Sequence, residues 1–161
     1  MSKQTQILFI SRPDHQSYHN SLIEKTRKYL KLTELPYLVM SNGVDLAFEK
    51  VDKGISAVVL CTLNLEGENR IFKKFYKIPG VRTGREIINY RQGLPRSNMP
   101  GLAFIDYLKE RKVKCGLIFD IHPGVETFLY NELGIGWVFP KNSRDECIIQ
   151  ALKNMLYPPK H

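Results

Sequence analysis

A chain of 161 residues with 43% hydrophobic and 25% charged residues can bury a core and has the balance of a globular protein. No apolar run reaches the length of a membrane span, and residues 1–5 lack the apolar core of a signal peptide. We therefore expect one cytoplasmic domain over residues 1–161, with no membrane partner. The three cysteines, Cys61, Cys115 and Cys147, show no CxxC spacing, which favours reduced, buried thiols over disulfides or a zinc site.

Five short apolar runs predict strands, because runs without polar alternation are typical of strands covered on both faces. In chain order they are residues 6–10, 37–40, 55–62, 115–119 and 134–139. Apolar residues at helical spacing lie between these runs. They include Leu22, Ile23, Thr26 and Tyr29, then Val44, Ala47, Phe48 and Val51, then Leu102, Ile105 and Leu108, then Val125, Phe128 and Leu129, and finally Cys147, Ile148 and Leu152. Strands that alternate with helices predict a doubly wound α/β fold with a parallel sheet.

Two helix starts carry capping signals. Asp14 is expected to cap the first helix, because its carboxylate can accept from free backbone N–H groups. Ser143, with Glu146 three residues later, is expected to form a capping box at the start of the last helix.

The net charge of +8 is concentrated in one segment after the third strand. Residues 70–96 hold eight basic residues and one acid, Glu86, and so carry +7 of the total. A connection this long is unusual within a compact domain and is typical of functional segments. We refer to residues 68–98 as the basic insertion.

Aromatic residues interleave with the cations of the basic insertion, a mixture suited to an acidic protein or to the bases and phosphates of a nucleic acid. The candidate contact residues are Arg70, Phe72, Lys73, Lys74, Phe75, Tyr76, Lys77, Arg82, Arg85, Arg91 and Arg96. No helix-turn-helix or other DNA-binding module is present, so a protein partner is the preferred hypothesis. Nucleic acid and a solvated loop are the alternatives.

The order of elements and two local phrases resemble the receiver domain of two-component response regulators. Residues 42–47, Asn-Gly-Val-Asp-Leu-Ala, are similar to the phrase that opens the family's second helix, and residues 133–141 to the phrase around its fifth strand. The resemblance covers residues 6–65 and 100–155, which is everything except the basic insertion. It implies a flavodoxin/CheY-like fold with strand order 2-1-3-4-5 and a signalling role.

Every chemical position of that family departs from its pattern in this chain. Ser11 and Arg12 stand in place of the acidic pair that holds Mg²⁺, and Cys61 in place of the phosphoacceptor Asp. Asp120 occupies the position where the family has Thr or Ser. After the fifth strand the family has Lys followed by Pro, whereas this chain has Pro140 followed by Lys141. The resemblance therefore implies a pseudo-receiver that has lost phosphorylation and acts through protein–protein contacts, with no cofactor, no metal and no catalytic residue.

By the same resemblance, residues 125–156 correspond to the face of helix 4, strand 5 and helix 5 through which receivers dimerise and contact partners. Trp137 stands at the strand position of a switching aromatic. A homodimer or a protein partner is therefore expected on this face.

Other interpretations of the strand ends remain open. Ser11, Cys61 and Asp120 could belong to a small flavodoxin-like enzyme or ligand-binding protein, although no base–nucleophile pair can be assigned and no GxGxxG or P-loop is present. Cys61 could be a reactive thiol whose pKa is lowered by Arg12. We favour the alternative, in which Cys61 is an inert, buried thiol. Asp120 could also pair with Arg12 or Lys141. Residues of the types that bind metals are also expected near this edge, namely Asp14, His15, His19, Asp120 and His122. Their spacing in the sequence does not match that of a known metal site, because no further ligand stands at a diagnostic distance along the chain.

Overall fold

The computed structural model describes residues 5–66, 99–118, 130–131 and 134–158. The basic insertion, Asp120, His122 and the helix expected around residues 125–129 lie outside the described residues. Among the helices that are described, none has both the length and the apolar character that crossing a membrane requires.

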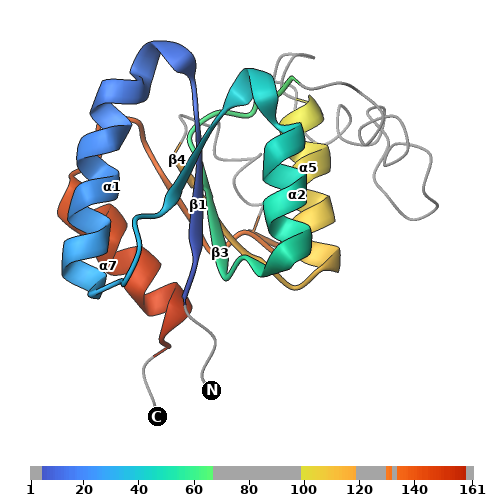
Figure 1. Ribbon diagram of the computed structural model, residues 1–161. Helices are drawn as coiled ribbons and strands as arrows, with labels where there is room; N and C mark the ends of the chain where they lie inside the picture. Colours follow the sequence, from blue (N-terminus) through green and yellow to red (C-terminus); the bar gives the residue numbers. More distant parts are fainter. Residues whose placement is uncertain (1–4, 67–98, 119–129, 132–133, 159–161) are drawn as a thin grey trace.

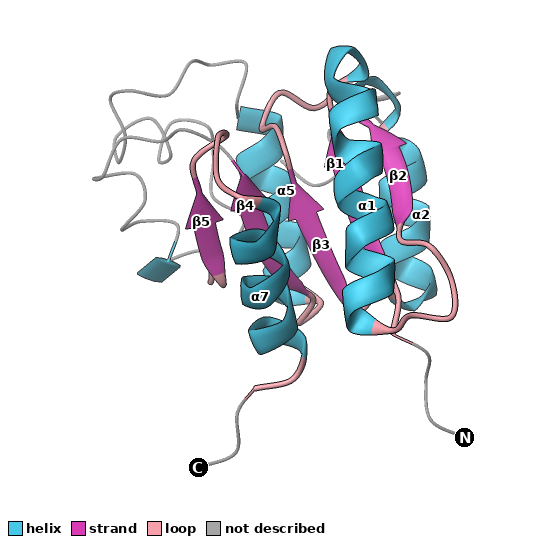
Figure 2. Cartoon of the chain, turned by 90° about the vertical axis from the view of Figure 1, so that its left-hand side faces the viewer, coloured by secondary structure: helices cyan, strands magenta, loops and turns pink. Residues whose placement is uncertain are grey.

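Five parallel strands form one sheet in the order β2-β1-β3-β4-β5, which confirms the predicted doubly wound α/β fold and its strand order. The strands are β1 (Ile7–Ser11), β2 (Tyr37–Met40), β3 (Ala57–Leu60), β4 (Lys114–Ile118) and β5 (Trp137–Phe139). β2 and β5 form the two edges of the sheet (Figure 2). Apart from Lys114, every residue of β1, β3 and β4 is buried, which explains why their sequences are apolar without alternation.

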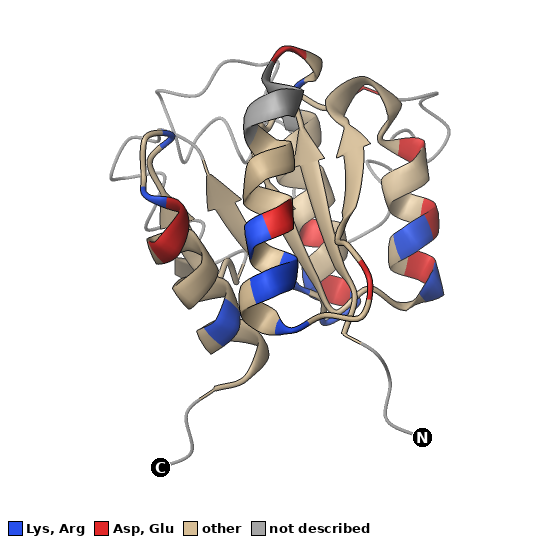
Figure 3. Ribbon diagram, turned by 60° about the vertical axis from the view of Figure 1, so that its left-hand side comes forward, with Lys and Arg blue, Asp and Glu red and all other residues tan. Residues whose placement is uncertain are grey.

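Helices cover both faces of the sheet (Figure 1). α1 (Gln16–Leu30) and α7 (Asp145–Leu156) lie on one face, and α2 (Asp45–Gly54) and α5 (Met99–Glu110) lie on the other. Two short 3-10 turns, η1 (Pro13–His15) and η2 (Ser41–Gly43), precede α1 and α2. In the described part of the chain, charged residues lie mainly in the helices and loops rather than within the strands (Figure 3).

Alternation along the strands divides the buried side chains into two clusters. Leu8 and Ile10 of β1 pack with residues of α2 and α5, and we call this cluster the α2–α5 core. Ile7 and Phe9 pack with residues of α1 and α7, which form the α1–α7 core. Because the period is two, the residue that follows Ile10 is directed to the α1–α7 side, and that residue is Ser11.

Two predictions about buried helix faces are wrong. Cys147 is exposed. The buried face of α7 is formed by Ile148, Ile149 and Leu152, so the larger Ile149 side chain is buried in its place. Tyr29 is 64% exposed, since it lies beyond the stripe by which α1 packs on the sheet. The rotation of α7 about its axis was misjudged by about one residue. In α1 the predicted stripe is confirmed at Leu22, Ile23 and Thr26, and only Tyr29 departs from it.

The predicted capping box at Ser143 is also wrong. The helix begins at Asp145, its N-cap is Arg144, and no side chain caps it. Ser143 therefore lies one residue too early to accept from the first turn. Asp145 and Glu146 lie in the first turn instead, where negative charge interacts favourably with the helix dipole.

Candidate functional site at the carboxyl edge of the sheet

The carboxyl ends of β1 and β3 bring Ser11 and Cys61 to the same edge of the sheet. The Cys61 backbone N–H donates to the Ile10 carbonyl at 2.8 Å, which continues the pairing of β1 with β3 by one residue. Ser11 is fully buried and Cys61 is 6% exposed. The resemblance predicted that these two positions would meet, and the structure places them side by side in the sheet.

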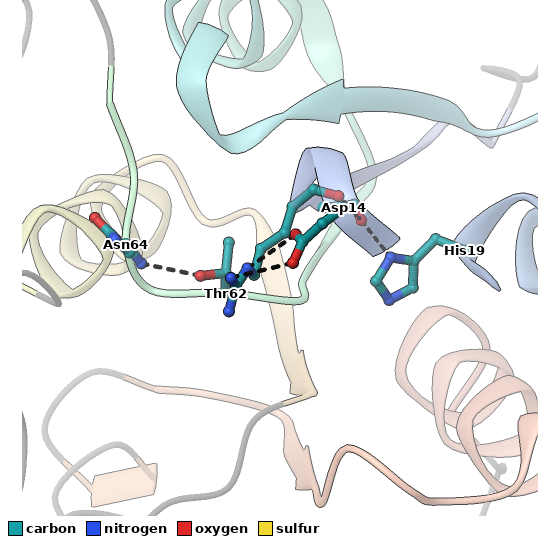
Figure 4. A network of polar contacts seen from close by, with 6 residues as sticks. Asp14, His19, Thr62 and Asn64 are labelled. Carbon is teal, nitrogen blue, oxygen red and sulfur yellow. Dashed lines mark hydrogen bonds and ion pairs between the residues drawn. The ribbon is translucent and has the colours of Figure 1, made fainter. Parts of the chain in front are cut away.

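The Ser11 hydroxyl contacts His19 of α1, a pair that sequence reasoning missed. His19 is 3% exposed, and its Nδ1 forms a hydrogen bond with Ser11 Oγ (Figure 4). Ser11 Oγ can also donate to the Arg12 carbonyl, at 3.2 Å. The direction of the Ser11–His19 hydrogen bond depends on the His19 tautomer, since either Oγ or Nδ1 can carry the shared proton.

Burial argues against a nucleophilic role for Ser11. A catalytic serine needs a base beside it and an open face toward its substrate. Ser11 is fully buried, so its hydroxyl has no open face for a substrate. The pair ties the end of β1 to α1 and satisfies two buried polar groups.

Arg12 makes a double contact with Asp14. Its Nε and one terminal nitrogen donate to the two carboxylate oxygens, each at 3.2 Å (Figure 4). The side chains are 48% and 57% exposed, so the pair lies at the surface, where it adds little to stability. Asp120, which was expected to pair with Arg12 or Lys141, lies outside the described residues.

Cys61 is a buried thiol, as predicted. Burial raises the pKa of Cys61 to about 12, because the thiolate would lose its hydration in the α1–α7 core. Arg12 does not lower this pKa, which favours the interpretation of an inert cysteine.

The segment after β3 is tied to helices on the α2–α5 side. Thr62 is buried, and its Oγ1 accepts from the Asn64 N–H at 3.1 Å (Figure 4). The Leu63 carbonyl accepts from the Gly101 N–H at 2.9 Å, and the Glu66 N–H donates to the Ser41 carbonyl at 2.6 Å. The chain is therefore anchored on both sides before it enters the basic insertion.

The remaining predicted site residues lie in different surroundings. Lys141 is exposed in the loop after β5. Trp137 is 7% exposed and packs in the α1–α7 core, where its ring lies 5.3 Å from that of Phe139. All of the contact residues predicted in the basic insertion lie outside the described residues.

Mg²⁺, the metal that the receiver resemblance implies, does not fit the side chains found here. It prefers several carboxylate or carbonyl oxygens. The described edge offers a hydroxyl that is already bonded, a guanidinium and a protonated thiol at positions 11, 12 and 61. The nearby Asp14 carboxylate is engaged by Arg12. Among residues 5–66, 99–118, 130–131 and 134–158, no three His, Cys, Asp or Glu side chains form a group that could hold a metal ion.

No family model matches the chain, and no curated protein sequence matches it. Among solved structures, it is similar to the crystal structure of the Francisella novicida lysine decarboxylase LdcF, with 11% sequence identity and a TM-score of 0.42. The similarity covers 96% of this chain and 18% of that chain. A likeness this distant carries no conclusion about activity, so the function has to be inferred from the residues of the site.

Proposed function

We propose that the protein is a pseudo-receiver, a module with the flavodoxin/CheY-like fold that regulates by protein–protein contact and is not switched by phosphorylation. The observation that carries this proposal is the set of side chains at the ends of β1 and β3. Receivers need carboxylates there to hold Mg²⁺ and to accept the phosphoryl group. This chain has Ser11, Arg12 and Cys61, each engaged or buried in a way that suits packing.

Two physical effects oppose phosphoryl acceptance at this edge. The Cys61 thiol stays protonated at neutral pH, so it is a weak nucleophile and a poor ligand for a hard cation. The Arg12 guanidinium adds positive charge where the metal would sit. A module without this trigger regulates either by a constant surface or by binding another molecule.

Intact-mass analysis after incubation with Mg²⁺ and acetyl phosphate tests the proposal. We expect no mass increase of one phosphoryl group, whereas a functional receiver treated in parallel acquires it. A stable adduct that disappears in Cys61→Ala would show that the thiol accepts phosphate and would refute the proposal. An adduct that persists in Cys61→Ala would place the acceptor elsewhere and would refute it as well.

The partner is proposed to be an acidic protein that contacts the basic insertion, with the face of β5 and α7 as a second contact or dimer surface. The support for the first contact is the charge of residues 70–96, +7 of the total +8. A pull-down with the full chain, repeated after deletion of residues 68–98, should lose the partner. Retention of the same partner by the deletion variant would exclude the insertion as its binding site.

Nucleic acid is the second candidate partner, favoured by the same local charge. Binding to a polyanion through this segment should weaken steeply as salt rises, because phosphate contacts release counterions. Charge reversal in the triple variant Lys73→Glu, Lys74→Glu, Lys77→Glu should abolish it. Binding that survives both treatments would exclude this role.

A further inference from the structure

A cavity of about 520 Å³, widely open to solvent, lies at the amino ends of β4 and β5, against the carboxyl-terminal half of α7. It is remote from Ser11 and Cys61, which lie at the opposite ends of the strands. Its volume falls within the range of cavities that hold small organic ligands. The lining includes Trp137, Ala151 and Met155, with Lys114 and Asn154 as the polar side chains.

Glycines give this region its shape. Gly116 of β4 leaves room for the Trp137 indole, because a Cβ at Gly116 would collide with the ring. A Cβ at Gly136 would meet Met155 Sδ at 2.8 Å. The indole therefore lies flat across β4 and supplies a rigid aromatic wall, while the Met155 thioether forms an adaptable one.

The polar groups of the lining are mostly donors. Among the described residues that line the cavity, Lys114 is the only one with a charged side chain. Its Nζ donates to the Met155 carbonyl at 2.5 Å, which holds the ammonium at the rim. The Trp137 Nε1–H is buried and has no acceptor among the described residues. None of the described residues that line the cavity is acidic.

From these observations we infer that the cavity binds an apolar monocarboxylate, with its hydrocarbon part against Trp137, Ala151 and Met155 and its carboxylate at Lys114. Burial of the apolar part supplies most of the affinity, and the single cation selects the sign of the head group. This inference does not depend on the proposed pseudo-receiver role, because it concerns the opposite end of the sheet.

Trp137 is the only tryptophan in the chain, so its fluorescence reports directly on the cavity. Titration of the full chain with octanoate should give a saturable change in emission. Octan-1-ol should bind more weakly, and octylammonium should give no saturable change, since its charge opposes Lys114. An absent response to octanoate, or equal responses to octanoate and octylammonium, would overturn the inference.

Variants locate the site. Lys114→Gln should weaken octanoate binding about two- to fivefold, the range for an exposed charge pair. Lys53→Gln, which removes the same charge from the last turn of α2 on the other face of the sheet, should leave binding unchanged. Ala151→Phe should fill the cavity and abolish the change in emission. If the Phe variant does not unfold cooperatively, Ala151→Leu replaces it as a smaller change at the same position. Full binding by either folded Ala151 variant, or by Lys114→Gln, would contradict the assignment.

Discussion

The two faces of the sheet are built differently. In the α2–α5 core, Phe48, Phe104 and Tyr107 form a cluster of rings, with Phe48 4.9 Å from each of the other two. The α1–α7 side holds the buried Ser11–His19 pair and the Trp137 Nε1–H, which has no partner among the described residues, and the cavity lined by Trp137, Ala151 and Met155 lies beside it. Among the described residues, it also holds fewer fully buried apolar side chains.

This difference indicates a division of roles. The α2–α5 face is closed by aromatic packing and by a surface network in which Asp52 accepts from Tyr107 and Arg111. Such a face contributes stability. The α1–α7 face holds the cavity and the Ser11–His19 pair, and so it is the face to which we assign the proposed ligand site. Four experiments test this contrast.

The largest expected effect comes from a matched pair of substitutions, Leu102→Ala in α5 and Leu152→Ala in α7. Both leucines are fully buried. Each change should cost about 2–5 kcal/mol, and Leu102→Ala should lie nearer the upper end, because a tightly packed aromatic core collapses less well into the space left behind. Urea unfolding measures both. Equal losses, or a larger loss for Leu152→Ala, would contradict the proposed difference in packing.

Gly116→Ala tests whether the Trp137 indole is fixed against β4. The added Cβ would collide with the ring, so the ring must move or the strand must shift. We expect a loss of about 1–3 kcal/mol, typical of an overpacked core, together with altered tryptophan emission. Gly43→Ala is the control, because a Cβ there meets nothing within 4 Å. Unchanged stability and emission for Gly116→Ala would show that the indole lies elsewhere.

The Ser11–His19 contact should appear as a coupling in a double-mutant cycle. Ser11→Ala, His19→Ala and the double variant are compared with the unaltered chain by urea unfolding. A coupling energy of about 0.5–1.5 kcal/mol is expected for a buried neutral hydrogen bond. Additive losses would mean that the two side chains do not stabilise each other in solution.

The smallest effect concerns pH and the α2–α5 surface. Burial raises the pKa of Asp52, but the hydrogen bonds from Tyr107 and Arg111 outweigh it and leave the pKa below its ordinary value. Since the folded pKa is the lower one, the contribution is present above the unfolded pKa and is lost as pH falls through the folded value. It should be less than about 1 kcal/mol, because the Asp52 side chain is 52% exposed.

Asp52→Asn measures this contribution. The variant should be less stable than the unaltered chain near neutral pH, and the difference should shrink as the pH falls below about 4. Glu49→Gln, a neighbouring change on the exposed side of α2, controls for the loss of one negative charge. A stability difference between the two proteins that grows as the pH falls would show that folding raises the pKa of Asp52 and does not lower it.

The strands and the fold class were predictable because apolar runs without alternation have one common explanation, a strand buried on both faces. The strand order came from the resemblance to receivers, and the register confirms it. Side-chain details were less predictable. The predicted stripe of α7 contains Cys147, whereas the observed stripe contains Ile149. A rotation of the helix by about one residue accounts for this exchange, and apolar residues on both sides of the stripe leave that rotation unspecified in the sequence.

The candidate site was predictable in its positions but not in its contacts. Ser11 and Cys61 could be placed at one edge, because parallel strands end together. The His19 contact depends on how α1 is rotated and how close it lies to β1, which local sequence patterns do not specify. The cavity depends on Gly116 and Gly136, and a glycine in a strand indicates a close approach without saying what approaches.

The backbone contact between Gly101 and Leu63 joins the two ends of the segment that contains the basic insertion, whatever that segment contains. A side chain at Gly101 would collide with Leu63, so the closure is tight. Lengthening a loop whose ends are already joined costs only about 0.6 kcal/mol for each doubling. Segments of different length and composition can therefore replace one another here while the sheet remains stable, which makes this junction a place for divergence among relatives and for grafting a foreign recognition peptide.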